Sequence, residues 1–101
     1  MSIKTANMQN MKELLNASTT SVLDVRSPME FAMEHIPGAK NIPINELSFR
    51  LDEIKELPKP IIVYCLSGGR SSMAVGILQE AGFTDVFNGG GISNMKQILY
   101  N

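Results

Sequence analysis

Apolar residues along the chain gather in short β-branched runs, separated by turn residues and by stretches with helical spacing. The clearest run, residues 61–64, is apolar at every position, which is typical of a central parallel strand covered on both faces. Residues 22–25 form a second β-branched run, and shorter runs occupy residues 3–5, 41–42 and 85–87. The pattern therefore predicts five short strands.

The stretches between these runs predict helices. A short helix is expected to begin at Ser27, because the serine can cap it, Pro28 suits its first turn and Glu30 completes a capping box. Longer stretches carry apolar residues at helical spacing. They are Met8, Met11, Leu14 and Leu15; Leu47, Leu51 and Ile54, in a helix that ends before Pro58; Ala74, Ile77, Leu78 and Ala81, before Gly82; and Ile92, Met95, Ile98 and Leu99.

Strands and helices alternate through the whole chain, which predicts an α/β fold. We expect one domain over residues 1–101, with a central parallel five-stranded sheet and helices on both faces. With 101 residues, 44% of them apolar, the chain is long enough to bury a core of its own. Ligands of such sheets bind beyond the carboxyl ends of the strands. The loop after residues 61–64 lies at such an end, and it begins with the only cysteine, Cys65.

Charge and cysteine content narrow the function classes. Nine Lys and Arg against ten Asp and Glu give a net charge of −1, so there is no basic field for a nucleic acid or an anionic membrane. No apolar stretch has the length of a membrane span, and the N-terminus lacks an apolar secretory segment. A single cysteine excludes an intrachain disulfide and a Cys-rich metal site. We expect a cytoplasmic protein with no metal and no cofactor.

The loop at residues 65–71 combines features that favour a reactive thiolate. Cys65 ends a buried strand, and Gly68 and Gly69 let the backbone turn its N–H groups inward. The N-terminus of the following helix adds partial positive charge, and Arg70 adds a permanent one. Together they predict an anion pocket with the sulfur at its floor, in a field that stabilises the nucleophilic thiolate.

Two other interpretations of this loop stay open. Cys65 could be an inert buried cysteine beside an ordinary strand–helix turn. The loop could also be that of a cysteine-dependent phosphatase, but the phosphatase signature places its arginine one residue further from the cysteine than Arg70 stands here. The shorter loop fits a single sulfur on the thiolate better than a phosphoryl group.

Several segments resemble signatures of the rhodanese-like domain family in its single-domain form. Residues 24–31 contain Asp-Val-Arg-Ser followed by Glu-Phe, and residues 35–43 are His-Ile-Pro-Gly-Ala-Lys-Asn-Ile-Pro. Residues 64–71 are similar to the family's active loop, and residues 82–91 to its closing segment. The family often has a tryptophan after the closing glycines, and this chain has none; Met95 is expected to take that place, with a consequence for packing only.

The resemblance implies a sulfurtransferase of the thiosulfate sulfurtransferase type. A small anionic donor such as thiosulfate would give its outer sulfur to Cys65, and the persulfide would pass it to cyanide, a thiol or a protein acceptor. Arg70 would bind the donor, the backbone amides of residues 66–70 would surround the outer sulfur, and the serines would add hydroxyl donors. The implied substrate-binding residues are Leu66, Ser67, Gly68, Gly69, Arg70 and Ser71.

Three alternative functions stand beside this enzyme. They are a persulfide carrier that serves one protein partner, a cysteine-dependent phosphatase or arsenate reductase, and a non-catalytic binding module. The phosphatase is disfavoured by the loop length, and the binding module by the presence of Cys65 in an intact loop. Residues 89–91 are all glycine, but the Lys and Ser/Thr of a phosphate-binding loop do not follow, so they predict a tight turn.

Two side chains outside the loop are candidates for a supporting role. His35, the only histidine, is expected to be a structural residue of a turn rather than a base for the thiol. Arg26 is expected to point away from Asp24 and to pair with Glu30 or Glu34, which would hold the helix that begins near Ser27.

Overall fold

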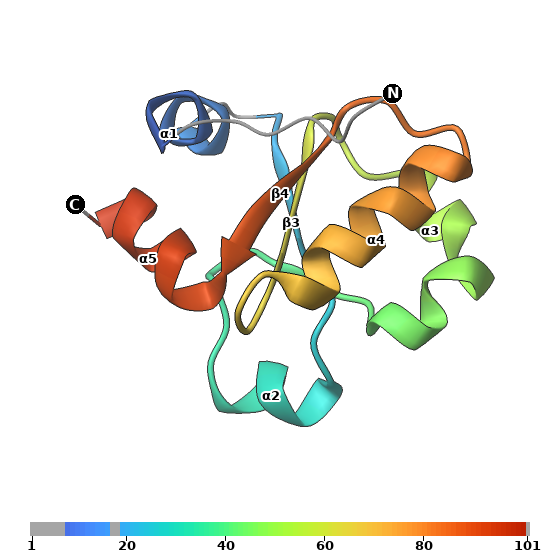
Figure 1. Cartoon of the computed structure of the whole chain (residues 1–101), viewed down its shortest axis with the longest axis horizontal. Coiled ribbons are helices and arrows are strands. Elements are labelled where there is room, and N and C mark those ends of the chain that lie inside the picture. Colours follow the sequence, from blue (N-terminus) through green and yellow to red (C-terminus); the bar gives the residue numbers. More distant parts are fainter. Residues whose placement is uncertain (1–7, 17–18, 101) are drawn as a thin grey trace.

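The computed structural model describes residues 8–16 and 19–100 of the chain (Figure 1). No helix within these ranges is both long and apolar enough to cross a bilayer. The elements, in chain order, are α1 (Met8–Asn16), β1 (Ser21–Asp24), α2 (Pro28–Met33), β2 (Lys40–Asn41), the 3₁₀ helix η1 (Ile44–Phe49), α3 (Leu51–Lys55), β3 (Ile61–Cys65), α4 (Gly69–Glu80), β4 (Val86–Gly91) and α5 (Ile92–Tyr100).

The strands of the described chain form one parallel sheet in the order β2-β1-β3-β4. The predicted α/β architecture with a parallel sheet is therefore confirmed, and β3, the most apolar run, lies inside the sheet. The sheet has four strands where five were predicted. The difference is the expected strand at residues 3–5, which lies outside the described residues.

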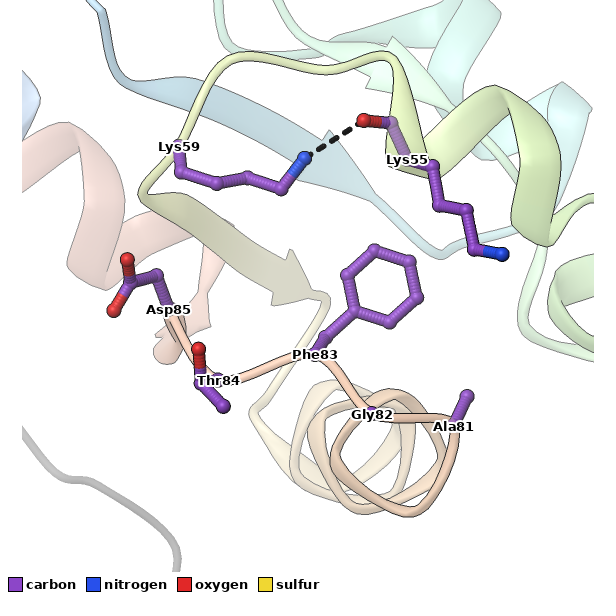
Figure 2. Close-up of a pocket in the computed structure, with 7 residues that line it drawn as sticks. All are labelled: Lys55, Lys59, Ala81, Gly82, Phe83, Thr84 and Asp85. Carbon is purple, nitrogen blue, oxygen red and sulfur yellow. Dashed lines mark hydrogen bonds between the residues drawn. The ribbon is translucent and has the colours of Figure 1, made fainter.

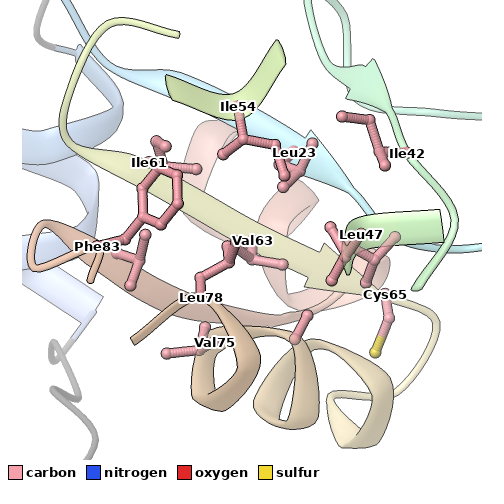
Figure 3. Close-up of a cluster of buried hydrophobic side chains, with 13 residues drawn as sticks. Leu23, Ile42, Leu47, Ile54, Ile61, Val63, Cys65, Val75, Leu78 and Phe83 are labelled. Carbon is pink, nitrogen blue, oxygen red and sulfur yellow. The ribbon is translucent and has the colours of Figure 1, made fainter. Parts of the chain in front are cut away.

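Strand β3 separates two apolar cores, because its side chains alternate between the faces of the sheet. Ile61, Val63 and Cys65 face a core that is covered by α3 and α4. Ile62 and Tyr64 face a second core, which lies against α1 and α5 (Figure 1). Figure 3 shows the first core, with the sulfur of Cys65 at its end beside the first turn of α4. The nucleophile candidate is therefore attached to the most buried part of the fold.

The helix predicted from Leu47, Leu51 and Ile54 ends before Pro58 as expected, but the prediction of one continuous helix is wrong. The chain instead forms η1 and then α3, with a break at Arg50, whose φ of −127° and ψ of 28° lie outside the helical region. The Arg50 N–H donates to the carbonyl of Leu47 at 3.1 Å, an i→i+3 bond that ends the 3₁₀ helix. The Arg50 guanidinium then binds Glu46 and Glu53, one on each side of the break. The spacing of apolar residues does not reveal this break, because η1 and α3 both pack against the same core.

The tight turn predicted at residues 89–91 is also wrong, since these glycines are the last part of β4. The register with β3 shifts just before Tyr64, as at a β-bulge. A Cβ on Gly89 would lie 2.6 Å from Sδ of the buried Met95, and Gly90 has a φ of 83°. Glycine is therefore required by close packing at one position and by backbone conformation at the next.

Candidate active site

Cys65 lies where the sequence placed it, at the carboxyl edge of the sheet, and it is only 1% exposed. The chain then turns through residues 66–68, and α4 begins at Gly69. Gly68 has a φ of 104°, a left-handed conformation that favours glycine, and its N–H donates to Sγ at 3.0 Å. The turn thus directs a backbone amide at the sulfur.

The acidity of the thiol depends on two opposing influences. Burial, the largest single influence, raises the pKa of Cys65. Hydrogen bonds from the Ser71 hydroxyl and from the backbone amides of Ser71, Gly68 and Ser67 favour the thiolate, and together they bring the pKa below its ordinary value. The positive end of α4 acts in the same direction. The loop therefore favours the nucleophilic form of the sulfur.

Ser71 of α4 contacts both the sulfur of Cys65 and a side chain of β4. It is completely buried, and its Oγ lies 3.4 Å from Sγ of Cys65, 3.0 Å from the carbonyl oxygen of Gly68 and 2.7 Å from Oδ1 of Asn88. Asn88 therefore belongs to the site, although the sequence analysis assigned it no role. The available signal was a polar residue directly before the glycine run, at the end of a predicted strand.

The glycines of β4 leave room for the loop. A Cβ on Gly91 would collide with the carbonyl oxygen of Leu66 and would lie 3.1 Å from the Cα of Ser67. A Cβ on Gly68 would be in ordinary contact, 3.7 Å from the Cα of Gly90. The backbones of the loop and of β4 thus lie directly against each other, and the Leu66 side chain is 55% exposed at the rim.

Arg70 is paired with a carboxylate of α2. Its Nη1 and Nη2 donate to Oε1 and Oε2 of Glu30 at 2.8 and 3.0 Å. The guanidinium, aided by the backbone N–H of Ser27, lowers the pKa of Glu30 to about 2. The same carboxylate closes the predicted capping box, because it accepts the Ser27 N–H at 2.9 Å. Sequence reasoning predicted the box but missed the ion pair, which joins residues 40 positions apart.

The predicted pairing of Arg26 is wrong. Arg26 and Asp24 are both buried on the same side of the chain, since residues two apart in an extended segment share a face. The Arg26 Nη2 donates to Oδ2 of Asp24 at 2.8 Å and to the backbone oxygen of Glu34 at 2.5 Å. Nearby, the Tyr64 hydroxyl accepts the Ile36 N–H at 3.0 Å. This buried network fixes the end of β3 from which the loop starts.

His35 contacts its own segment of the chain rather than the sulfur. Its ring is stacked on Phe31 with centroids 3.7 Å apart, and its Nδ1 donates to the Phe31 carbonyl at 2.8 Å. Both contacts join the turn after α2 to Phe31 within that helix, which fits the predicted structural role.

A pocket of about 250 Å³ lies at the opposite end of β3 from Cys65 (Figure 2). The ammonium of Lys59 is held there by the carbonyls of Lys55 and Leu57 at 2.9 and 2.7 Å, and it lies 5.8 Å from the ring centre of Phe83. Parallel sheets bind ligands at the carboxyl ends of their strands, and this pocket lies at the amino ends. The loop that begins at Cys65 is therefore the candidate active site.

Comparisons with known proteins identify the family of the chain. A model of the rhodanese-like domain matches residues 7–97. Thiosulfate sulfurtransferase PspE of Escherichia coli is 38% identical over 72% of this chain and 71% of its own length. Protein YqhL of Bacillus subtilis is 42% identical over 66% of this chain, and the match spans about half, 52%, of that relative. The structure of the human single-domain sulfurtransferase TSTD1 matches with a TM-score of 0.76 and 27% identity, over 95% of this chain and 97% of that one.

Proposed function

The chain belongs to the family of rhodanese-like domains, and we propose that it is a sulfurtransferase that carries sulfane sulfur as a persulfide on Cys65. The observation that carries the proposal is the Gly68 N–H, held 3.0 Å from the sulfur of an acidified thiol. The name of its relative PspE supports thiosulfate as the donor. Such a donor is a small anion, which suits a loop at a helix N-terminus.

In the first proposed step, the Cys65 thiolate attacks the outer sulfur of thiosulfate. A new S–S bond forms at Sγ, the S–S bond of thiosulfate breaks, and its electron pair leaves with sulfite. The product is an anionic persulfide, whose charge lies on the terminal sulfur. The backbone amides of residues 66–70 and the N-terminus of α4 stabilise that charge without reorganisation.

In the second proposed step, a thiophilic acceptor attacks the terminal sulfur. Cyanide takes it as thiocyanate and a thiolate takes it as a new persulfide, and in both cases the electron pair of the broken S–S bond returns to Sγ of Cys65. The chain contains no second cysteine that could accept the sulfur, so the acceptor is an external molecule. The exposed Leu66 side chain marks the rim where that acceptor approaches.

Arg70 is proposed to bind the oxygens of the donor. Its bidentate pair with Glu30 uses two of the five N–H donors of the guanidinium, and the remaining ones are available to a second anion. The side chain is 38% exposed, so a donor can contact it from solvent. Within the proposed mechanism, Glu30 fixes the direction of the guanidinium and Arg70 recognises the sulfonate end of thiosulfate.

A second candidate function is a persulfide carrier that serves one protein partner. It is favoured by exposed apolar side chains on the loop and on the helix paired with it: Leu66 in the loop, and Met29 and Met33 on α2, the helix that holds Glu30. Apolar side chains at a reaction site contribute little to the binding of thiosulfate, but they contribute to the binding of a protein surface. Under this function, a protein thiol would discharge the persulfide much faster than cyanide does.

Two assays on one metal-free preparation test the proposal. Thiocyanate formation from thiosulfate and cyanide should be measurable, and hydrolysis of an aryl phosphate should be negligible, because the short loop surrounds one sulfur rather than a phosphoryl group. The Cys65→Ser variant, which retains the buried polar atom and lacks the thiol, is the matched control. Robust phosphatase activity that depends on Cys65, with no sulfur transfer, would replace the proposal with the phosphatase alternative.

A further inference from the structure

The hydroxyl of Ser71 is surrounded by more acceptors than it has protons. Its Oγ lies 2.7 Å from Oδ1 of Asn88, 3.0 Å from the carbonyl oxygen of Gly68 and 3.4 Å from that of Gly90. The sulfur of Cys65 is 3.4 Å away on another side. A hydroxyl has one proton to donate, and Ser71 is completely buried, so no water competes for it. Donation to one of these groups excludes donation to the others.

The orientation of the Asn88 amide decides which acceptor is closest. The backbone N–H of Gly90 donates to Oδ1 of Asn88 at 2.9 Å. If the amide were turned over, its NH₂ group would face this N–H, and two donors would oppose each other. The oxygen of Asn88 therefore faces Ser71, and at 2.7 Å two oxygens require the Ser71 proton between them.

The two charge states of the sulfur use Ser71 in opposite ways. In the thiol, the S–H donates to Oγ of Ser71, and Ser71 in turn donates to Asn88. In the thiolate, no proton remains on the sulfur, and Ser71 stabilises the negative charge only if its own proton turns from Asn88 to Sγ. That rotation leaves the oxygens of Ser71 and Asn88 in contact without a proton. Asn88 thus opposes the hydrogen bond that the thiolate needs.

We propose that Asn88 is a positioning residue that sets the acidity of Cys65, because it competes with the thiolate for the single proton of Ser71. The inference rests on the proposed function only in taking Cys65 as the reactive sulfur. Its physical basis is that hydrogen bonding to the charged form of a group lowers the pKa of an acid, and competition for the donor weakens this effect. A thiol whose pKa stays nearer to the working pH is also a better nucleophile as thiolate than a more acidic one.

Substitution of Asn88 does not change the charged groups around the sulfur. The charged side chains of the elements packed around it form ion pairs with one another, and these pairs do not involve Asn88. They are Arg70 of α4 with Glu30 of α2, Asp24 of β1 with Arg26, and Glu46 of η1 with Arg50. Strand β4 itself has no charged side chain. A change in acidity on substitution of Asn88 therefore reports on the Ser71 proton.

The test is the pKa of Cys65 in four proteins: the wild type, Asn88→Ala, Ser71→Ala and the double variant. Because the chain has one cysteine, the ultraviolet absorbance of the thiolate as a function of pH reports on Cys65 alone, and Cys65→Ser supplies the blank. Asn88→Ala should lower the pKa by about one unit when Ser71 is present. The same substitution should change it by much less in the Ser71→Ala background.

A purely structural role for Asn88 would give the same shift in both backgrounds, and this result, or no shift or a rise in Asn88→Ala, would overturn the proposal. Asn88→Asp covers the case in which the alanine variant does not fold, because aspartate keeps the acceptor for Gly90 N–H. It should raise the pKa more with Ser71 present than with Ala at that position, and an equal rise would also overturn the proposal. The titration uses no sulfur donor, so a failure of the proposed sulfur transfer would not be mistaken for a failure of this inference.

Discussion

The chemistry of Cys65 rests on a few hydrogen bonds that oppose the effect of burial. A cysteine that is 1% exposed in an apolar core would ordinarily be a weak acid and a poor nucleophile. The loop amides and the Ser71 hydroxyl reverse that tendency, since on balance they favour the charged form over the neutral thiol. At this scale, the site is a balance between desolvation and a small number of donors.

Arg70→Ala is expected to weaken the use of thiosulfate more than it weakens the intrinsic reactivity of the thiol. A charge-assisted contact is worth about 1.5–3 kcal/mol, or roughly a ten- to hundredfold loss in kcat/KM for thiosulfate. The rate of alkylation by uncharged iodoacetamide should change less. Arg70→Lys should restore only part of the loss, because a point charge lacks the forked geometry.

Arg50→Ala is the matched control for Arg70, because Arg50 also forms a bidentate pair with a glutamate, Glu53, but lies between η1 and α3. It should leave thiosulfate use unchanged. An equal decrease in thiosulfate use and in alkylation for Arg70→Ala would show that Arg70 acts on the sulfur or the loop instead of on the donor.

At the scale of elements, α2 and β4 each hold the loop from one side. Helix α2 is tied to the start of α4 by Glu30 and Arg70, and the glycine end of β4 lies against the backbone of residues 66–68. The loop is therefore positioned by elements that come both before and after it in the chain.

The ion pair between α2 and α4 should make stability depend on acid pH. The pKa of Glu30 is about 2 in the folded protein, below the ordinary value of 4.5, so its contribution is complete above about 4.5 and is lost as the pH falls toward 2. Glu30→Gln keeps the capping box but removes the charge. Urea unfolding over this range should show a larger fall in the free energy of unfolding for the wild type than for Glu30→Gln. Parallel curves for the two proteins would contradict the assignment.

The glycine end of β4 should not tolerate a side chain. Gly91→Ala places a methyl group against the Leu66 carbonyl, so the loop must move, and we expect a loss of about 1–3 kcal/mol in the free energy of unfolding together with slower sulfur transfer. Gly76→Ala is the control, since it lies within α4 with no atom near its Cβ position. It should stabilise the protein by about 0.5–1 kcal/mol with unchanged activity. Wild-type activity in Gly91→Ala would show that the close approach is dispensable.

At the scale of the whole molecule, local patterns predict the sheet, and contacts distant in sequence complete the site. The apolar run that became β3 and the capping box of α2 depend on neighbouring residues, so both were predictable. The break at Arg50 was not, because it depends on side-chain pairing that leaves the apolar spacing intact. The Glu30–Arg70 pair and the Asn88–Ser71 contact join residues 40 and 17 positions apart, so no local pattern contains them.

The wrong prediction for residues 89–91 has a different physical cause from the missed side-chain pairs. A run of glycines predicts a turn when it is considered alone, because glycine adopts conformations that other residues avoid. In the folded protein Gly89 and Gly91 are selected by the lack of space between β4, the loop and Met95, and only Gly90 is selected by its left-handed backbone conformation. Close approach of two backbones depends on how the whole molecule folds. In the sequence its only sign is the glycines, which have no side chain.

The most direct test of the central claim is the intact mass of the protein after incubation with thiosulfate and removal of excess donor. The wild type should gain the mass of one sulfur atom, addition of cyanide should remove it with release of thiocyanate, and Cys65→Ser should gain nothing while it keeps the wild-type fold by circular dichroism. An unmodified wild-type mass after incubation, or an equal gain in Cys65→Ser, would contradict a persulfide on Cys65.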